Sequence, residues 1–155
     1  MKKQLILYAA LLASLTFGAP SYAVDIPSPN GQRMAFVNLG LLSIQSEKGM
    51  HMLGRIWTNQ SYLPTWHPNG DGIAYFRQKK IRLLNGRQTV AVHLYFYDVL
   101  KQKEYQLTSD FEDLLDIPQR ADITFGPETQ LITARLWYAW GRYWEVQMPL
   151  PKKKP

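Results

Sequence analysis

The chain has 155 residues, of which 46% are hydrophobic and 13% aromatic, and it contains no cysteine. This composition supports one domain with a hydrophobic core, and it excludes general disorder, a disulfide scaffold, thiol catalysis and a cysteine-ligated metal site. The formal net charge is +6, but five positive charges lie near the two chain ends, which leaves about +1 on the folded part. That charge is too small to indicate a nucleic-acid-binding surface.

The first 23 residues have the pattern of a secretory signal peptide. Lys2 and Lys3 give a positive start, the apolar run covers 5–17, and small residues precede the expected cleavage site after Ala23. The apolar run is shorter than the roughly 20 residues of a transmembrane helix, which disfavours a membrane anchor. We therefore expect a periplasmic or secreted mature protein that starts at Val24.

A short turn motif organises the rest of the chain, and it consists of Trp66, His67, Pro68, Asn69 and Gly70. Pro68 suits the first corner of a type I turn and Asn69 the second, while Gly70 can take the positive φ of the following bulge. The motif predicts a tight hairpin with an aromatic anchor on each arm.

The same spacing recurs twice. Pro29, Asn30 and Gly31 repeat the turn 39 residues before Pro68, and Pro127 repeats it without the glycine 59 residues after Pro68. About four short β-rich runs follow in each copy, and a period near 40 residues with four strands is typical of a propeller blade.

The repeats divide the chain into a signal peptide, one β domain and a basic tail. The expected ranges are 1–23 for the signal peptide, 24–151 for the domain, 24–54, 63–108 and 121–148 for its three blades, and 152–155 for the tail. The longer second interval contains the run 79–90, whose Asn85-Gly86 pair predicts a further hairpin turn. It also contains 109–119, where a short helical turn is expected.

The second copy resembles the repeat of TolB-like β-propellers, a WD-type repeat family. Residues 66–75 read WHPNGDGIAY, residues 94–98 read LYFYD and residues 106–108 read QLT. The family pattern has tryptophan, serine, proline, aspartate and glycine before an isoleucine-alanine-phenylalanine strand, so His67 and Asn69 depart from it. The resemblance implies an all-β fold of antiparallel, four-stranded propeller-type blades with a binding role, and it implies nothing about chemistry.

Three blades are too few to close a ring, since closed propellers have roughly four to eight. Pro149 and Pro151 exclude a further central strand after the last run, so the third copy lacks its outermost strand. The chain must stay open, assemble with another chain or be a remnant of a longer protein. Two chains could form a six-bladed ring, with 24–27 of one chain supplying the missing strand of the other.

Five aromatic residues near the end of the domain form the candidate binding surface. They are Trp137, Tyr138, Trp140, Tyr143 and Trp144. Alternate residues of a strand face opposite sides, so about half of the set can pack between blades while the rest forms an exposed surface for a protein or a sugar ring.

Other polar residues suggest no metal or catalytic site. His67 can cap its turn through a ring nitrogen or act as a ligand, and His51 and His93 have no second histidine at metal-binding spacing. The acidic group 110–116 can act as paired carboxylates in glycoside cleavage, or it can favour a helix N-terminus and face solvent. Nucleophile elbows and phosphate-binding glycine loops are missing from the sequence.

These features predict a non-catalytic protein–protein interaction or scaffold module of the bacterial envelope, without a cofactor or metal. The expected partner is another protein or a second copy of the chain, with no nucleic acid and no stable membrane insertion. One alternative is a carbohydrate-binding or enzyme-accessory module that uses the hairpin 137–144. Another is a truncated propeller relic.

Overall fold

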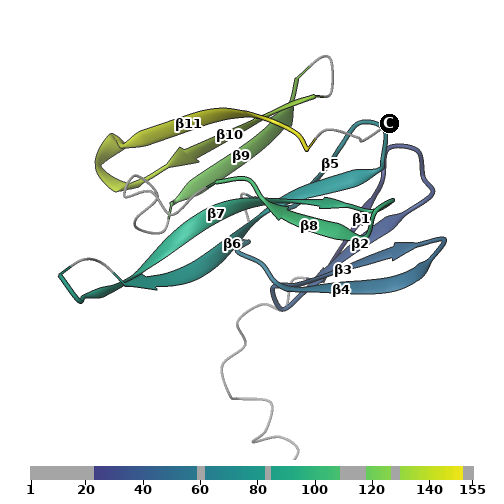
Figure 1. Ribbon diagram of the computed structural model, residues 1–155, viewed down its shortest axis with the longest axis horizontal. Helices are drawn as coiled ribbons and strands as arrows, with labels where there is room; N and C mark the ends of the chain where they lie inside the picture. The colour runs from purple at the N-terminus through teal and green to yellow at the C-terminus, as the bar shows by residue number, and fades with distance from the viewer. Residues whose placement is uncertain (1–22, 59–61, 83–84, 109–117, 127–129, 152–155) are drawn as a thin grey trace, which may run out of the picture.

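The computed structural model describes residues 23–58, 62–82, 85–108, 118–126 and 130–151. These residues form three antiparallel sheets that succeed one another along the chain, and none of the sheets closes into a ring (Figure 1). The predicted all-β fold of open, propeller-type blades is confirmed. The signal peptide, apart from Ala23, and the basic tail lie outside the described residues.

Each sheet has its strands in chain order. The first sheet comprises β1 (Val24–Pro27), β2 (Met34–Asn38), β3 (Leu41–Ser46) and β4 (Gly49–Arg55). The middle sheet comprises β5 (Thr65–Trp66), β6 (Gly72–Arg82), β7 (Gln88–Asp98) and β8 (Lys103–Gln106). The third sheet comprises β9 (Arg120–Phe125), β10 (Leu131–Trp137) and β11 (Tyr143–Pro149), with a 3-10 turn, η2 (Ala139–Gly141), between the last two.

Among the residues that the structure describes, the third sheet has no counterpart of β4 and β8, as the prolines at 149 and 151 predicted. The segment that could have filled this position from a second chain, Val24–Pro27, forms β1 and pairs with β2 of its own chain. It is therefore not a free strand. None of the described segments forms a helix with the length and hydrophobicity of a membrane span.

The predicted turn at Asn85-Gly86 is confirmed, but it adds no separate hairpin. Strands β6 and β7 are eleven residues long each, and the run 79–90 forms the far end of this one long hairpin. Gly86 has a φ of 82°, and the side-chain oxygen of Asn85 accepts a hydrogen bond of 3.0 Å from the backbone N–H of Arg87.

The turn motif has the predicted geometry. Gly70 has a φ of 74° and Gly31 a φ of 68°, and the Gly70 N–H donates to the His67 carbonyl at 2.8 Å. One backbone hydrogen bond with the same five-residue spacing closes the hairpin in all three copies. In the first copy the Ser28 N–H donates to the Arg33 carbonyl. In the second the His67 N–H donates to the Gly72 carbonyl, and in the third the Gly126 N–H donates to the Leu131 carbonyl, at 2.9 Å in each case. The third copy thus keeps the closing hydrogen bond of the hairpin.

The first two turns also contact each other. The Asn30 amide donates to the Asn69 carbonyl at 3.2 Å, and the Arg33 guanidinium donates to the Gly70 carbonyl at 2.7 Å. Next to them, the indole N–H of Trp66 donates to the carbonyl of Ile26 in β1 at 2.8 Å. The motif therefore joins the first sheet to the middle sheet.

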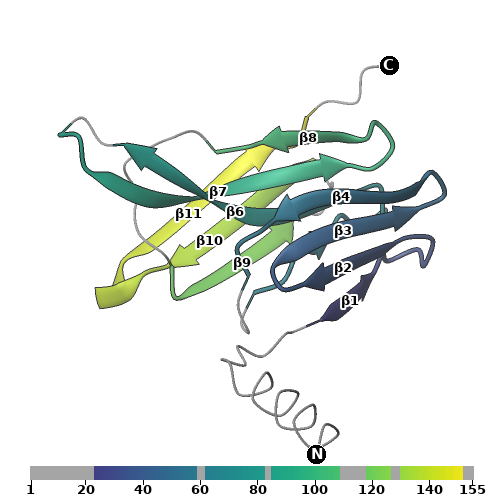
Figure 2. The ribbon, with the colours of Figure 1, turned by 90° about the horizontal axis from the view of Figure 1, so that it is seen from below.

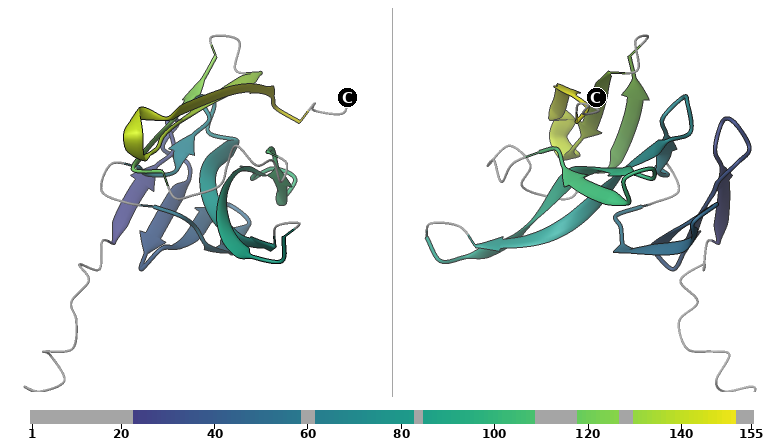
Figure 3. Two further views of the ribbon diagram at one scale, coloured as in Figure 1. Left: turned by 90° about the vertical axis from the view of Figure 1, so that its left-hand side faces the viewer. Right: turned by 45° about the vertical axis from the view of Figure 1, so that its right-hand side comes forward.

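The core consists of two layers, one on each side of the middle sheet (Figures 2 and 3). Successive side chains of a strand face opposite sides, and β6 shows this clearly. Ile73 and Tyr75 belong to the layer shared with the first sheet, while Ala74 and Phe76 belong to the layer shared with the third sheet, and all four are fully buried. The first and third sheets each bury only one side, so the stack has two end faces.

Candidate functional site

The outer side of the first sheet forms an apolar end face. Its large side chains are Met34, Phe36, Leu41, Met50 and Met52. Strand register places Phe36 beside Ser43 and Ser43 beside Met52, and it places Met34 beside Gln45 and Gln45 beside Met50. Side chains at paired positions share one side of a sheet, so these residues form one surface.

Several of these side chains are open to solvent in spite of their apolar character. Met50 is 62% exposed, Met52 is 68% exposed and Leu41 is 38% exposed, while Met34 and Phe36 are half-buried. The opposite side of the same sheet holds buried core residues such as Leu42 and Ile44. A large apolar patch on a sheet face is typical of an interaction site, and methionine side chains adapt to varied partner shapes.

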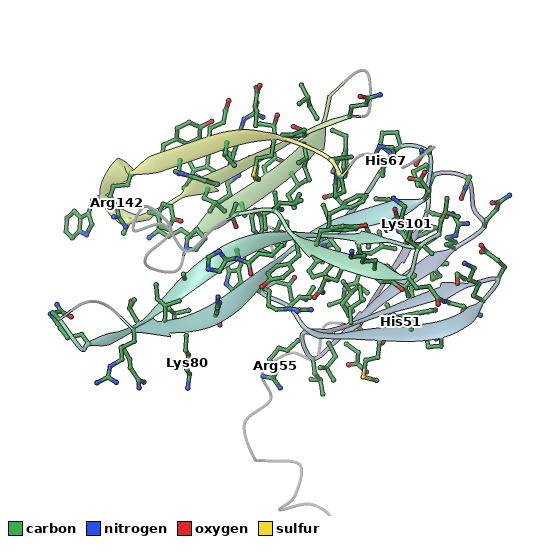
Figure 4. All side chains as sticks on the ribbon, in the orientation of Figure 1. His51, Arg55, His67, Lys80, Lys101 and Arg142 are labelled. Carbon is green, nitrogen blue, oxygen red and sulfur yellow. The ribbon has the colours of Figure 1, made fainter. Side chains whose placement is uncertain are left out.

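Charged residues lie at the two margins of the apolar end face. Asp25 is exposed on edge strand β1, next to Phe36 in the register. Arg55 is exposed at the end of edge strand β4, next to Leu41, and Figure 4 shows it at the lower border of the sheet. The surface therefore has apolar side chains on β2 and β4, the polar residues Ser43 and Gln45 of β3 between them, and charges at its margins.

The outer side of the third sheet forms a polar end face instead. The Arg135 guanidinium contacts the Glu145 carboxylate at 2.8 Å and the Asp122 carboxylate at 3.5 Å. In the next row, Trp137 packs on Tyr143 with ring centroids 5.4 Å apart, and Arg120 lies 4.8 Å from the Trp137 ring centre. These charges already have partners and remain accessible to water.

A hydrogen bond from the Tyr143 hydroxyl links the two rows of the polar end face. The pKa of the Glu145 carboxyl lies below its usual value. The hydrogen bond from Tyr143 is the larger cause of this shift, and the hydrogen bond from Arg135 is the second. The same bond to Glu145 raises the pKa of the Tyr143 hydroxyl. Both shifts favour a neutral tyrosine donor and a charged carboxylate acceptor at neutral pH.

The five predicted aromatic residues do not form one surface. Trp140 is fully exposed at the hairpin tip, with a φ of 63°, and Tyr143 is 50% exposed on the polar end face. Tyr138 is 5% exposed, and Trp144 packs half-buried against the core between the middle and third sheets. Tyr138 is therefore wrong as a surface residue, because it follows the last residue of β10 and turns into the core.

The His67 ring lies buried inside its turn, where a ring nitrogen contacts the Asn69 side chain and lies 3.3 Å from the Asp71 carboxylate. The backbone cap comes from Asn69, whose side-chain oxygen accepts the Asp71 N–H at 3.1 Å. His67 also packs edge-to-face against Phe125 of the third sheet, with centroids 5.0 Å apart. His67 therefore contacts the Asn69 side chain that caps the turn, and it packs against the third sheet.

The other two histidines lie in separate places. His51 stacks on Tyr97 with ring centroids 5.2 Å apart, and His93 is buried with a ring nitrogen 3.2 Å from the Thr108 hydroxyl. Within the described residues, no group of three or more potential ligands could hold a metal ion. The acidic residues at 110, 112, 113 and 116 lie outside the described part of the chain.

Two surfaces were not predicted from the sequence. One is the apolar end face, and the other is a basic ribbon at the far end of the β6–β7 hairpin, formed by Lys79, Lys80, Arg82 and Arg87 (Figure 4). The sequence signal for the ribbon is the lack of any acidic residue between 72 and 97. The signal for the apolar face is β2, which is apolar at four successive positions.

Comparison with known proteins gives weak structural likenesses only. No family model matches the chain, and no curated protein matches it in sequence. A structure titled as the crystal structure of the eukaryotic initiation factor is 10% identical with a TM-score of 0.38, over 79% of this chain and 30% of that one. A putative TolB from Agrobacterium tumefaciens is 13% identical with a TM-score of 0.28, over 87% of this chain and 64% of that one.

The chain thus spans less than two thirds of the length of either protein, and neither likeness is close enough to carry an argument about function. Membership of the TolB-like repeat family stays a prediction from the residues.

Proposed function

We propose that the mature chain is an exported, non-catalytic module of the bacterial envelope that binds another protein through its apolar end face. The exposure of Met50 and Met52, which share the outer side of the first sheet with Phe36, carries this proposal. Folding does not need these side chains to be apolar, since the core lies on the other side of the sheet. Burial against a partner would be favourable, because apolar area removed from water contributes about 25 cal/mol per Å².

A ring of two chains fits this surface less well than a different protein does. Ring closure would pack the apolar end face of one chain on the polar end face of the other. Arg135 and its two carboxylates would then lose water against a face whose large side chains are mostly apolar, and such desolvation is costly. We therefore propose a heterologous protein with an apolar contact surface.

Photo-crosslinking in the source cells tests this proposal. Benzoylphenylalanine at position 52 should give one discrete adduct with another envelope protein, whereas the same group at Thr124, exposed on the polar end face, should give none. Equal adducts at both positions, or none at position 52, would contradict the proposal. An adduct of twice the chain mass would identify a second copy and contradict the heterologous partner.

The export part of the proposal rests on the pattern of residues 1–23 and has its own test. Mass spectrometry of the envelope fraction should find Val24 as the first residue. Intact Met1 in the membrane fraction would contradict export with cleavage.

One observation favours carbohydrate binding as a second candidate function. The Trp140 ring is fully exposed at the hairpin tip, and Arg142 lies near it at the same end of the third sheet (Figure 4). An exposed indole can stack on the apolar side of a sugar ring. A glycan array would support this function if selective binding is lost in Trp140→Ala and kept in Met52→Ala, and an array without binding would argue against it.

A further inference from the structure

The third sheet ends at β11, at a position where the other two sheets have one more strand. In the first sheet β4 follows β3, and in the middle sheet β8 follows β7, with antiparallel pairing in both. Strand β11 is the counterpart of β3 and β7, and within the described residues no strand pairs with its outer edge (Figure 1). The fold therefore has a vacant strand position next to 143–149.

The hydrogen bonds that flank β11 show which of its backbone groups point to that position. The Tyr138 N–H donates to the Arg142 carbonyl, and the Leu150 N–H donates to the Gln130 carbonyl, both at 2.8 Å. Antiparallel pairs alternate between bonded and non-bonded residues. Residues 144, 146 and 148 therefore bond to β10, and Tyr143, Glu145 and Gln147 direct their N–H and carbonyl groups outward.

The side chains next to the vacant position have a clear alternation. Trp144, Val146 and Met148 are half-buried against the core between the middle and third sheets. Tyr143, Glu145 and Gln147 are exposed on the polar end face. An added strand would place alternate side chains beside these two sets, because directly opposite residues share a side of the sheet.

We propose that the free edge of β11 binds an extended segment of another protein, which adds to the third sheet as its fourth, antiparallel strand. The segment carries apolar residues opposite Trp144, Val146 and Met148 and polar residues opposite Tyr143, Glu145 and Gln147. Backbone hydrogen bonds supply affinity and the alternating side chains supply selectivity, as in other cases of strand addition. This site is separate from the apolar end face and does not depend on it.

A second copy of β11 suits this position less well than a foreign strand. Symmetric pairing centred on Glu145 would place two glutamates directly opposite each other, which is unfavourable. A shift by one residue pair would place Pro149, which has no N–H, opposite Tyr143. Both of these symmetric registers thus lose favourable contacts.

Synthetic peptides test the proposal. The probe is an acetylated and amidated peptide, Lys-Val-Thr-Val-Thr-Val-Lys, titrated into the isotope-labelled mature protein. Amide shifts should concentrate at 143–148. N-methylation of both threonines, which removes the N–H groups that face β11, should weaken binding at least tenfold, and N-methylation of the valines should leave it unchanged. Shifts centred on β1, β4 or β8, no shifts at millimolar peptide, or equal binding of both methylated peptides would overturn the proposal.

A pair of protein variants gives the matched control on the other side of the contact. Gln147→Pro removes one outward N–H and keeps the pairing with β10, so it should fold and bind the peptide at least tenfold more weakly. Gln147→Ala removes only the side chain and should bind as the wild type does. Equal binding by the two variants would contradict the backbone mechanism. A dimer that Gln147→Pro dissociates would show that a second copy fills the site, which would overturn the choice of a foreign strand.

Discussion

The first and third sheets both cover the middle sheet with one apolar side. Their outer sides differ. The first sheet presents Leu41, Met50 and Met52 to solvent, whereas the third presents Arg135 bonded to Glu145 and close to Asp122. The polar side needs no further cover, because its charges have partners and water. The apolar side has no such partners, and in our proposal the surface of another protein covers it.

The largest expected effect is a difference in the free energy of unfolding between substitutions on the inner and on the outer side of the first sheet. Ile44 is 1% exposed in the inner layer, so Ile44→Ala should lower the free energy of unfolding by about 2–5 kcal/mol. Met52 is 68% exposed on the outer side of the same sheet, so Met52→Ala should change it by less than about 0.5 kcal/mol. Urea unfolding of both variants measures the difference. Similar losses would mean that the outer side also stabilises the fold.

The next effect concerns the contact between the first two turns, which joins the first sheet to the middle sheet. Gly31 and Gly70 both have positive φ, but a Cβ at Gly70 would lie 2.8 Å from the Asn30 side chain, and a Cβ at Gly31 would meet nothing within 4 Å. Gly31→Ala should therefore cost about 1 kcal/mol from backbone strain alone. Gly70→Ala should cost more, about 1–3 kcal/mol, and Gly70→Val at least as much.

Thermal unfolding of the matched alanine variants tests this difference. Equal melting temperatures would show that the contact between the first two turns does not hold the sheets together.

A charge added to the apolar end face should change association and leave the fold intact. Met52→Lys should reduce the fluorescence of a hydrophobic dye bound to the protein and abolish the adduct formed from a crosslinker at Met50. Thr124→Lys, on the polar end face, should change neither readout. Equal dye binding in wild type and Met52→Lys would contradict an accessible apolar patch.

The smallest expected effect is the pH dependence of the stability that Glu145 contributes on the polar end face. The folded-state pKa of Glu145 lies below its ordinary value of 4.5, first through the Tyr143 hydroxyl and next through Arg135. Its contribution to stability is therefore fully present above pH 4.5 and is lost as the pH falls through the lower folded-state pKa.

Glu145→Gln should make the loss of stability below pH 4.5 less steep than in the wild type. High salt should reduce the difference, because the pair is exposed and screened by ions. Identical acid unfolding curves of the two proteins at low salt would show that the Tyr143–Glu145–Arg135 contact adds no stability.

Features that depend on local backbone chemistry could be predicted from the sequence. Pro68, Asn69 and Gly70 fix dihedral angles within the turn itself. Pro149 is the last residue of β11, and Pro149 and Pro151 disfavour a further central strand because proline lacks an N–H. The strand count and the missing fourth strand of the third sheet followed from these signals. His67 was predicted to cap the turn, yet the cap is the Asn69 side chain, since only the structure shows which of two polar neighbours reaches the backbone.

The candidate site was harder to predict, because exposure depends on which sheet has a neighbour. Strand β2 is apolar on both sides, as a central strand would be, and no local signal reveals that one side has no covering sheet. Tyr138 and Trp140 lie two residues apart, but the 3-10 turn between β10 and β11 sends one into the core and the other into solvent. Alternation predicts that Trp137 and Tyr138 face opposite sides, but it does not show which of the two faces the core.

Hydroxyl-radical footprinting of the protein in its own cell envelope and after purification tests the central claim most directly. Radicals oxidise exposed methionine and tryptophan side chains, and the fully exposed Trp140 is an internal reference at the other end of the stack. We expect Met50 and Met52 to be oxidised rapidly in the purified protein and protected in the envelope, while Trp140 is oxidised equally in both. Equal oxidation of Met50 and Met52 in the two samples would contradict the apolar end face as a docking surface.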